Sequence, residues 1–385
     1  MLIGVVGAPN KGKSTFFSAA TMVDAQIANY PFTTISPNKG VTYVRAPCPH
    51  MGLGLPKCDA KNSKCIGGIR LVPVNMVDVP GLVPDAHLGK GLGNRFLDSI
   101  READALIQVV DATGKTDLYG NFCEESSPIL EVEFLKEEIG QWLAGILMRK
   151  EPKPRNLKEI ALLLSGLKIS ERMLLDAASR CGLDISEGLP DKEGVLCITR
   201  KLVEMRMPIA IACNKADVEG ARKNYEAMKA IFGERVFFTS AAIELALRKA
   251  SEKGIAKYVP GDSYFEIVGK VEERQMEALD RVRLFLAKNS GSGVQQIIDW
   301  VVYNLLGGII VYPVEDEHKY SNHKGEVLPD ALLVPKGTTA LQLAEKVHTE
   351  LAQKFIGAFD VKRKIRIGAE SILSNGDVIK IIASR

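Results

Sequence analysis

The chain has 385 residues, of which 46% are hydrophobic and 25% are charged, and its formal net charge is +3. The length predicts two or three domains, and the composition is that of an ordinary globular protein. The charge is too small to indicate nucleic-acid binding, and no apolar run approaches the roughly 18–20 residues of a membrane-spanning helix. The first predicted strand begins at Leu2, so we expect no signal peptide, and the odd number of cysteines predicts reduced thiols in the cytoplasm.

The first motif is a phosphate-binding loop of the pattern GxxxxGK[ST], in residues 7–15. It follows the apolar run 2–6, which predicts a buried strand, and precedes residues 16–20, which can continue as a helix. The two glycines let successive backbone N–H groups point at a phosphate, the lysine adds a full charge, and the serine hydroxyl can ligate magnesium. The residues that we expect to contact the nucleotide here are Gly7, Ala8, Pro9, Asn10, Lys11, Gly12, Lys13, Ser14 and Thr15.

Two later segments predict the remaining magnesium and γ-phosphate contacts. Residues 23–40 contain two prolines without periodicity and predict a loop, in which Thr34, with Thr33 as its competitor, is expected to ligate magnesium. The strand-like residues 69–77 end at Asp78, which suits a carboxylate that orients magnesium. The N–H of Gly81 is then expected to contact the γ-phosphate.

The residue after this glycine is Leu82, where Ras-type enzymes have a water-orienting glutamine. Another group must therefore position the attacking water or neutralise the transition state. Asn10 is one candidate, because its side-chain carbonyl can ligate a monovalent cation, such as potassium, between the phosphates. His87 is the second candidate, although a histidine in a loop is more often simply solvated. The catalytic residues that we predict are Lys13, Asn10 and Gly81.

Residues 46–68 contain a cluster of cysteines after the strand 41–44. The side chains that zinc accepts are Cys48, His50, Cys58 and Cys65. Their spacing is not that of paired CxxC motifs, and buried or merely reduced cysteines explain the stretch as well. We interpret the segment as an inserted loop, with a zinc site as the alternative.

The middle of the chain is predicted to be a helical insertion between two strands of one sheet. Residues 103–110 predict a buried strand, Ser127-Pro128 opens one helix, and Ser170 opens another that ends near Gly182. The apolar positions of these helices are interpreted as an internal packing surface rather than a groove for a partner.

The strand 208–213 is followed at once by the sequence Asn214-Lys215-Ala216-Asp217, of the pattern NKxD. The aspartate can accept the N1–H and the exocyclic amine hydrogens of guanine, which adenine does not offer in that arrangement. The lysine can pack its stem over the base. After the next strand, 236–238, the backbone N–H groups of Ser240 and Ala241 are expected to contact the guanine carbonyl. The motif therefore predicts GTP as the nucleotide.

The rest of the chain is predicted to be helical over residues 243–306 and then to form a small β-grasp-like domain. Its strand-like segments are 309–312, 326–328, 331–334 and 378–382, and a capping box at 339–342 opens a helix through Val347. The basic run 362–366 alternates as an edge strand would. It is interpreted either as an RNA-phosphate contact or as a solvated edge.

These motifs together resemble the Obg-related GTPases, nearest the YchF/Obg-like ATPase branch in an archaeal-type form. The segment 89–97, read Gly-Lys-Gly-Leu-Gly-Asn-Arg-Phe-Leu, and the apolar Leu82 also match that family, and the C-terminal segment resembles a TGS domain. The resemblance implies hydrolysis of a nucleoside triphosphate in association with ribosomes or translation, and a coiled-coil-like helical insertion. The best-known YchF members have a degenerate base-specificity motif and prefer ATP, whereas the intact motif here predicts GTP.

We therefore expect an α/β fold with a P-loop NTPase domain, a helical insertion and a C-terminal β-grasp TGS domain. The expected boundaries are 1–114 with 206–306, 115–205, and 307–385. The predicted function is that of a magnesium-dependent GTPase switch, with potassium as a candidate activator. It is expected to act on the ribosome through the TGS and helical domains, in the cytoplasm and without a membrane. The alternatives are a ribosome- or RNA-binding adaptor that uses nucleotide as a structural ligand, and an ATPase.

Overall fold

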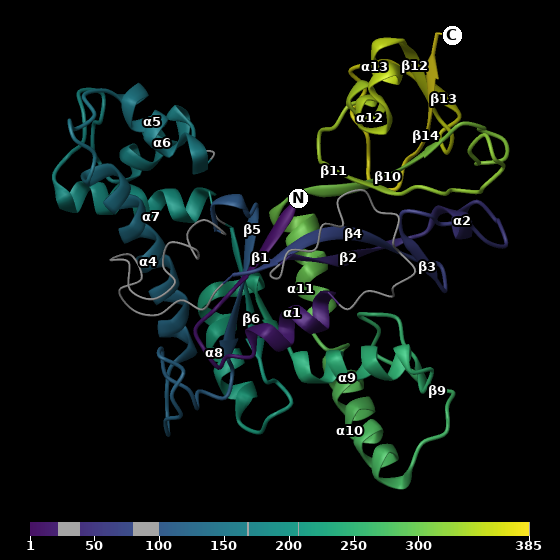
Figure 1. Ribbon diagram of the computed structural model, residues 1–385, viewed down its shortest axis with the longest axis horizontal. Helices are drawn as coiled ribbons and strands as arrows, with labels where there is room; N and C mark the ends of the chain where they lie inside the picture. The colour runs from purple at the N-terminus through teal and green to yellow at the C-terminus, as the bar shows by residue number, and fades with distance from the viewer. Residues whose placement is uncertain (22–38, 80–99, 168, 207, 385) are drawn as a thin grey trace. The chain divides into compact units, whose positions relative to one another are not determined.

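The computed structural model describes residues 1–21, 39–79, 100–167, 169–206 and 208–384 (Figure 1). It divides into two compact units. The first consists mainly of Met1–Ala20 and Met76–Ile297, and the second mainly of Gly40–Asn75 and Ile298–Arg385. None of the helices in the described segments is both long and apolar enough to cross a bilayer.

A parallel sheet forms the centre of the first unit. Its strands β1 (Leu2–Val6), β5 (Ala105–Asp111), β6 (Ile209–Asn214) and β7 (Val236–Phe238) follow one another in this order. They are nearly continuous apolar runs, as expected for strands covered on both faces, and β5 and β6 are buried throughout. Because the strands are parallel, their carboxyl ends share one edge. The phosphate-loop sequence, Asp111 and Asn214 lie at this edge.

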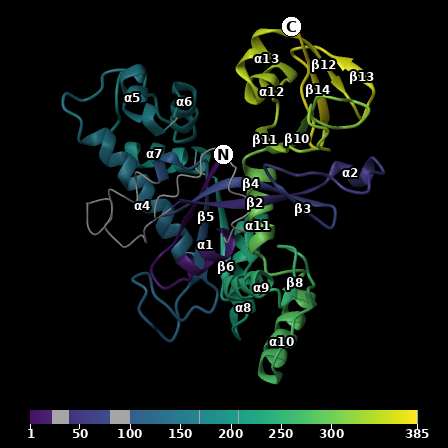
Figure 2. The same ribbon diagram turned by 45° about the vertical axis from the view of Figure 1, so that its right-hand side comes forward.

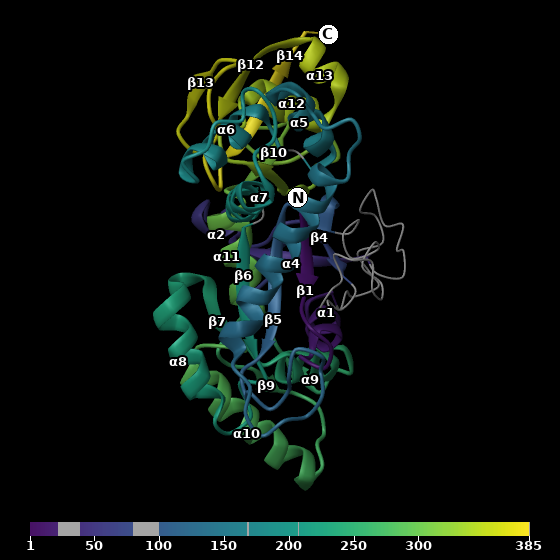
Figure 3. The same cartoon turned by 90° about the vertical axis from the view of Figure 1, so that its left-hand side faces the viewer.

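Helices α4 (Pro128–Met148) and α8 (Ala221–Phe232) cover one face of this sheet (Figure 3). Val132 of α4 and Met228 of α8 are fully buried against Val110 and Ile211. Helix α1 (Lys13–Thr21) begins directly after the phosphate-loop glycine, Gly12. The strands and the helix predicted around the phosphate loop are therefore confirmed.

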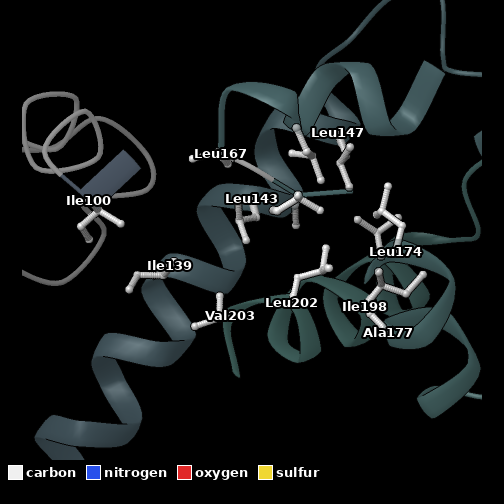
Figure 4. Close-up of a cluster of buried hydrophobic side chains, with 14 of the residues drawn as sticks. Ile100, Ile139, Leu143, Leu147, Leu167, Leu174, Ala177, Ile198, Leu202 and Val203 are labelled. Carbon is white, nitrogen blue, oxygen red and sulfur yellow. The ribbon is translucent and has the colours of Figure 1, made fainter. Parts of the chain in front are cut away.

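The helical part of the first unit has a core that is continuous with buried residues of the sheet, such as Val6 and Leu106, and in it α4 packs against α7 (Figure 4). The elements are α4, α5 (Leu157–Leu164), a 3₁₀ turn (Ser165–Leu167), α6 (Glu171–Arg180) and α7 (Lys192–Arg206). Leu143, Leu174 and Leu202 meet there, each at most 1% exposed. The predicted helix starts are confirmed, because α4 begins at Pro128 and the hydroxyl of Ser170 caps α6.

Two cysteines of this helical core form a disulfide, which corrects the prediction that all thiols are reduced. Cys181 follows α6 and Cys197 lies in α7, and their sulfurs are bonded. The packing of α6 against α7 brings these two residues together across 16 positions of sequence. Five other cysteines are free thiols.

The segment that follows β7 is not helical throughout, contrary to the prediction for residues 243–306. Its elements are α9 (Ala241–Glu252), β8 (Ala256–Lys257), β9 (Glu266–Ile267), α10 (Glu273–Asn289), α11 (Val294–Trp300) and a π-helical turn (Val301–Leu305), and a 3₁₀ turn (Gly233–Arg235) precedes β7. The antiparallel β8–β9 pair interrupts the helices because Tyr258 and Phe265 fold back to pack with α9 and α10.

The second unit contains a five-stranded sheet of the expected β-grasp type (Figure 2). Its strand order is β11-β10-β14-β12-β13, and Leu343 of α12 is buried in the core beneath it. The elements are β10 (Gly308–Val314), β11 (Leu332–Pro335), α12 (Ala340–Val347), α13 (Thr349–Gln353), β12 (Phe355–Asp360), β13 (Ile365–Ile367) and β14 (Val378–Ala383). The predicted capping box is confirmed, since Thr339 and Gln342 cap the start of α12 reciprocally.

Two details of this domain differ from prediction. Residues 326–328 are not a strand of the sheet, because Val327 instead exchanges hydrogen bonds with Asp59 of the cysteine-bearing loop. The basic run is only partly the predicted edge strand. Val361–Lys364 form a turn, while Ile365 and Arg366 belong to β13 at the edge of the sheet.

The second unit also holds the inserted loop and its flanking strands. These are β2 (Lys39–Pro47), α2 (Pro49–Gly52), β3 (Lys64–Ile66) and β4 (Ile69–Asp78), whose last residues belong to the first unit. β3 and β4 form an antiparallel pair in which Cys65 lies opposite Arg70.

Candidate functional site

The phosphate-loop sequence forms a turn that requires both of its glycines. Gly7 and Gly12 have φ angles of +155° and +87°, which disfavour a side chain. A Cβ on Gly7 would lie 2.5 Å from the carbonyl oxygen of Val109, and a Cβ on Gly12 would lie 2.4 Å from Nδ2 of Asn214. Ala8 is buried, and Ser14 is exposed at the start of α1. The backbone of this loop is thus fitted closely to β5 and to the NKxD motif.

Asn214 braces the loop from the neighbouring strand. Its Nδ2 donates to the carbonyl of Lys11 (3.0 Å), and its Oδ1 accepts from the N–H of Ala241 (3.0 Å). One buried side chain therefore joins the phosphate loop, the end of β6 and the start of α9. Both of its hydrogen-bonding groups are used within the protein.

Lys11 is completely buried, so its ammonium points away from the face on which a phosphate would bind. Its Nζ donates to the carbonyl (2.8 Å) and the hydroxyl (2.9 Å) of Thr116 and to Oε1 of Glu131 (2.7 Å). Burial raises the pKa of Glu131 to about 7, although the charge of Lys11 opposes the rise. The predicted nucleotide contact of Lys11 is therefore limited to its backbone, because its side chain anchors the loop to α4.

Lys13 and Asp78 lie together at the opening of the site. Nζ of Lys13 donates to Oδ1 of Asp78 over 2.9 Å, and both side chains are partly exposed. The sequence predicted that one binds phosphate and that the other orients magnesium. Their contact shows that the two side chains reach one another, and both predicted roles stay predictions.

Asn10 is exposed and has a φ angle of +60°, in the left-handed region. Its Nδ2 donates to the carbonyl of Gly120 (2.9 Å), in a turn of residues 117–121. A Cβ on Gly120 would lie 2.8 Å from Cβ of Pro9, so this turn packs directly on the phosphate loop. The hydrogen bond uses the amide NH₂ group, so the Oδ1 atom that a cation needs is not the atom engaged in it.

The end of β5 supplies an acidic residue for which the sequence had indicated no role. Oδ2 of the buried Asp111 accepts from Nζ of Lys215 (2.7 Å) and from the hydroxyl of Thr116 (2.8 Å). Burial raises the pKa of Asp111, but hydrogen bonds from Lys215, Thr113 and Thr116 outweigh it and hold the pKa below its usual value. The signal that could have identified this residue is a carboxylate at the end of a buried strand next to the NKxD strand.

The residues predicted to recognise the base are Asp217 and, at the start of α9, Ser240 and Ala241. The Ser240 hydroxyl donates to Oδ1 of Asp217 over 2.5 Å, and it also caps α9 by accepting from the N–H of Ile243. The N–H of Ser240 donates to the carbonyl of Ser292 (2.8 Å), and the N–H of Ala241 donates to Asn214. A guanine carbonyl would therefore have to share or displace these bonds, which the sequence did not reveal.

Comparison with known proteins identifies the family of this chain. An uncharacterized GTP-binding protein of Methanocaldococcus jannaschii is 48% identical over 394 residues, covering 100% of this chain and 99% of its own. Three family models match, described as 50S ribosome-binding GTPase (residues 2–141), Obg-like GTPase YGR210-like, G4 motif-containing domain (212–316) and TGS domain (323–383). The chain belongs to the Obg-like, YchF-type GTPases.

A solved member of this kind has the same architecture. The crystal structure of a GTP binding protein from Pyrococcus horikoshii OT3 is 35% identical, covers 100% of both chains and has a TM-score of 0.77. A ribosome-binding ATPase YchF of Haemophilus ducreyi is 40% identical over 138 residues, which are 35% of each chain. Membership of the Obg-like GTPases implies hydrolysis of a nucleoside triphosphate and, typically, Mg²⁺. The P-loop fold and the C-terminal TGS domain predicted from the sequence are confirmed.

Several predicted site residues of this Obg-like protein lie outside the described residues. They are Thr34 and its competitor Thr33, Gly81, Leu82 and His87. Their predicted roles stay predictions. The described part of the site brings together Gly12, Lys13, Asp78, Asn214 and Asp217, either directly or through the network around Asn214.

The cysteine-bearing loop gathers its four candidate ligands in the second unit. The ligand atoms of Cys48, His50, Cys58 and Cys65 all lie within 4.8 Å of one another. Cys48 and His50 are buried, and the other two are partly buried. In the sequence, the irregular spacing of these four residues weakened the zinc interpretation. In the structure, the turn of α2 and the β3–β4 hairpin bring the four residues together.

Proposed function

We propose that this chain binds GTP and hydrolyses it to GDP and phosphate with the help of Mg²⁺. The observation that carries the proposal is the carboxylate of Asp217, the residue of the NKxD motif that can distinguish guanine, which accepts a hydrogen bond from the Ser240 hydroxyl. Asn214 of the same motif braces the phosphate loop. The phosphate loop and the base-recognition residues are thus joined in one hydrogen-bonded network.

Asp217 selects guanine through the direction of its hydrogen bonds. One carboxylate oxygen accepts from the Ser240 hydroxyl, which fixes the orientation of the group. The carboxylate then accepts the N1–H and amine hydrogens of guanine, while adenine presents an acceptor at N1. A polar group that loses its partner in this way disfavours the wrong base strongly.

Lys13 contacts the β- and γ-phosphates, and Ser14 and Thr34 ligate the magnesium ion that Asp78 holds through water. The ion pair between Lys13 and Asp78 supports this assignment because it shows that both groups reach the same position. Preorganised charges of this kind stabilise the developing charge of phosphoryl transfer. The N–H of Gly81 contacts the γ-phosphate in this scheme.

Asn10 recruits a potassium ion between the phosphates and so replaces part of the function of the missing glutamine at Leu82. Its hydrogen bond to Gly120 supports the proposal by holding the amide group in one orientation. Hydrolysis is then faster in potassium than in sodium, and the variant Asn10→Ala loses this difference. Equal rates of the unaltered protein in the two salts would remove Asn10 from the mechanism.

Base specificity is tested with the variant Asp217→Asn. The unaltered protein is expected to hydrolyse GTP and to leave ATP largely unused. The amide of the variant can donate to the C2 carbonyl of xanthine, so Asp217→Asn should lose GTP and gain xanthosine triphosphate. The variant Ser240→Ala serves as a milder control that weakens GTP binding without changing the preferred base. Equal affinity of the unaltered protein for ATP and GTP would favour the ATPase alternative, which the name of the Haemophilus ducreyi relative supports.

The GTPase is further proposed to act as a switch on the ribosome, in the cytoplasm, through its TGS and helical domains. The boundaries proposed for the GTPase domain are 1–114 and 206–306, for the helical domain 115–205, and for the TGS domain 307–385. The match to a ribosome-binding GTPase model and the name of the YchF relative support this partner.

Co-sedimentation with ribosomes distinguishes the switch from an adaptor that holds nucleotide only as a structural ligand. The switch predicts that binding differs between GTP, GDP and no nucleotide, and that the variant Lys13→Ala loses this dependence. Unchanged ribosome binding in all of these conditions would favour the adaptor.

A further inference from the structure

We propose that Cys48, His50, Cys58 and Cys65 form a structural zinc site that holds the inserted loop against the TGS domain. The four ligand atoms lie within 4.8 Å of one another, although the residues span 18 positions of sequence. Three thiolates and one imidazole are a common ligand set of closed, tetrahedral zinc sites. The proposal concerns the second unit and does not depend on nucleotide binding or hydrolysis.

The distances between the ligand atoms fit a tetrahedron around one ion. Zinc–sulfur bonds of about 2.3 Å place two sulfurs of a tetrahedral site roughly 3.8 Å apart. The sulfurs of Cys48 and Cys58 are 3.7 Å apart, and the sulfur of Cys65 lies 3.8 Å from Nδ1 of His50. The first distance is also far too long for a disulfide bond.

Arg70 supplies the charge that such a site requires. Zinc with three thiolates and a neutral imidazole carries a net charge of −1. Arg70 lies opposite Cys65 in the β3–β4 pair, so both side chains are on the same face of the hairpin. Its guanidinium is fully buried, and its hydrogen bonds go to neutral groups, the Ser63 hydroxyl (3.1 Å) and the Leu328 carbonyl (2.6 Å).

The Nε of Arg70 also has no hydrogen-bond partner within the described part of the chain. The carboxyl of Asp330 is close enough to interact electrostatically with Arg70, and the Tyr312 ring lies 5.6 Å from its guanidinium. A zinc–thiolate centre of charge −1 would add a second anionic group beside this buried cation. The charge of Arg70 is therefore favourable for the proposed metal site.

The loop between the ligands is fastened to one segment of the TGS side, residues 326–331. Asp59 and Val327 exchange two hydrogen bonds, in which Asp59 N–H donates to the Val327 carbonyl (2.8 Å) and Val327 N–H donates to the Asp59 carboxylate (2.9 Å). Asn62 exchanges two more with Ala331, at 3.1 and 2.9 Å. Asp59 and Asn62 lie between Cys58 and Cys65, so a metal that fixes the two cysteines also fixes this contact.

Metal analysis of the purified full-length protein tests the site. We expect one zinc per chain by elemental mass spectrometry, lost on prolonged chelation and regained on addition of zinc alone. Cobalt in place of zinc should give the intense visible absorption of a tetrahedral thiolate site. Absence of zinc together with failure of the chelated protein to rebind zinc or cobalt would overturn the proposal, as would iron or copper in its place.

Two cysteine variants separate a metal ligand from an ordinary thiol. Cys58→Ser changes a partly buried ligand and should lower the bound zinc several-fold and alter the cobalt spectrum. Cys123→Ser changes another partly buried free cysteine outside the cluster and should leave both unchanged. Equal metal content in the two variants would contradict the assignment. A disulfide between Cys48 and Cys58, found by thiol counting of the freshly purified protein, would contradict it as well.

Hydrogen exchange tests the fastening of residues 326–331. Removal of zinc from the full chain should speed amide exchange at Val327 and Ala331, whose N–H groups donate to the loop. Exchange in α12 of the same domain should stay unchanged, because its first amides donate to Thr339, Ala369 and Ser371, and none of the acceptors belongs to the cysteine-bearing loop. If chelation changed the exchange rates of residues 326–331 and of α12 equally, or changed neither rate, the metal site would not stabilise this contact.

Discussion

Asn214 lies so close to Gly12 that adding one methyl group, in the variant Gly12→Ala, tests whether this contact shapes the phosphate loop. In the variant Gly12→Ala, the new Cβ would lie 2.4 Å from Nδ2 of Asn214, on a backbone with φ of +87°. Such a contact forces the amide of Asn214 to move. The movement breaks its hydrogen bond to the Lys11 carbonyl, which fixes the course of the phosphate loop.

The expected loss combines two effects. An alanine in the left-handed region costs about 1–2 kcal/mol relative to glycine. Loss of the buried hydrogen bond leaves the Lys11 carbonyl without its partner and costs about 1–3 kcal/mol more. If the whole of the resulting 2–5 kcal/mol opposes the binding conformation of the loop, nucleotide affinity falls by roughly 30-fold to several thousand-fold.

Equilibrium binding of a fluorescent GDP analogue, together with thermal unfolding, measures both consequences. Gly182→Ala is the matched control, because Gly182 also has a positive φ, +67°, but nothing lies within 4 Å of its added Cβ. The control should lose stability through backbone strain alone and should keep its nucleotide affinity.

A second background isolates the contact itself. In Asn214→Ala the amide is absent, so adding Gly12→Ala should cost only the backbone strain and the two effects should not add. Full additivity of the two substitutions, or an affinity of Gly12→Ala equal to that of Gly182→Ala, would refute the reasoning.

Three further predictions concern stability. Burial raises the pKa of Glu131 from 4.5 to about 7. Its favourable contribution to the free energy of unfolding is therefore complete below pH 4.5 and is lost as the pH rises through 7. Glu131→Gln should flatten the pH dependence of this free energy, measured by urea unfolding, between pH 5 and 8. Reduction of the Cys181–Cys197 disulfide, or Cys181→Ser, should lower the free energy of unfolding by about 3 kcal/mol, and reductant should have no effect on the variant. Leu202→Ala in the helical core should cost about 2–5 kcal/mol, whereas Leu162→Ala, at a side chain 73% exposed, should cost less than about 0.5 kcal/mol, both measured by urea unfolding.

The elements that the sequence predicted correctly are those with a local cause. The strand before the phosphate loop is a continuous apolar run, α6 begins at a serine cap, and α12 begins at a capping box. Each of these signals operates within a few residues. The NKxD motif could be placed for the same reason, since it follows a short apolar strand directly.

The features that the sequence did not predict depend on partners far along the chain. The side chain of Lys11 is turned inward by Thr116 and Glu131, which lie 105 and 120 residues away. Residues 326–328 have a strand-like composition, but Asp59 takes the hydrogen bonds that a neighbouring strand would make. Pairings over such separations leave no periodic pattern in the sequence, because each partner is a single residue in an otherwise ordinary segment.

The contacts of the NKxD motif indicate which of its residues supports the prediction of GTP. Asn214 uses both ends of its amide to hold the phosphate loop and α9, and the ammonium of Lys215 pairs with Asp111. The contacts of both residues are with other protein groups, and Asn214 would hold the phosphate loop whichever base was bound. An intact motif therefore supports the proposal of guanine only through Asp217, whose carboxylate accepts a hydrogen bond from the Ser240 hydroxyl. Substitution of Asn214 should weaken GTP and ATP alike, while substitution of Asp217 should change the ratio of the two.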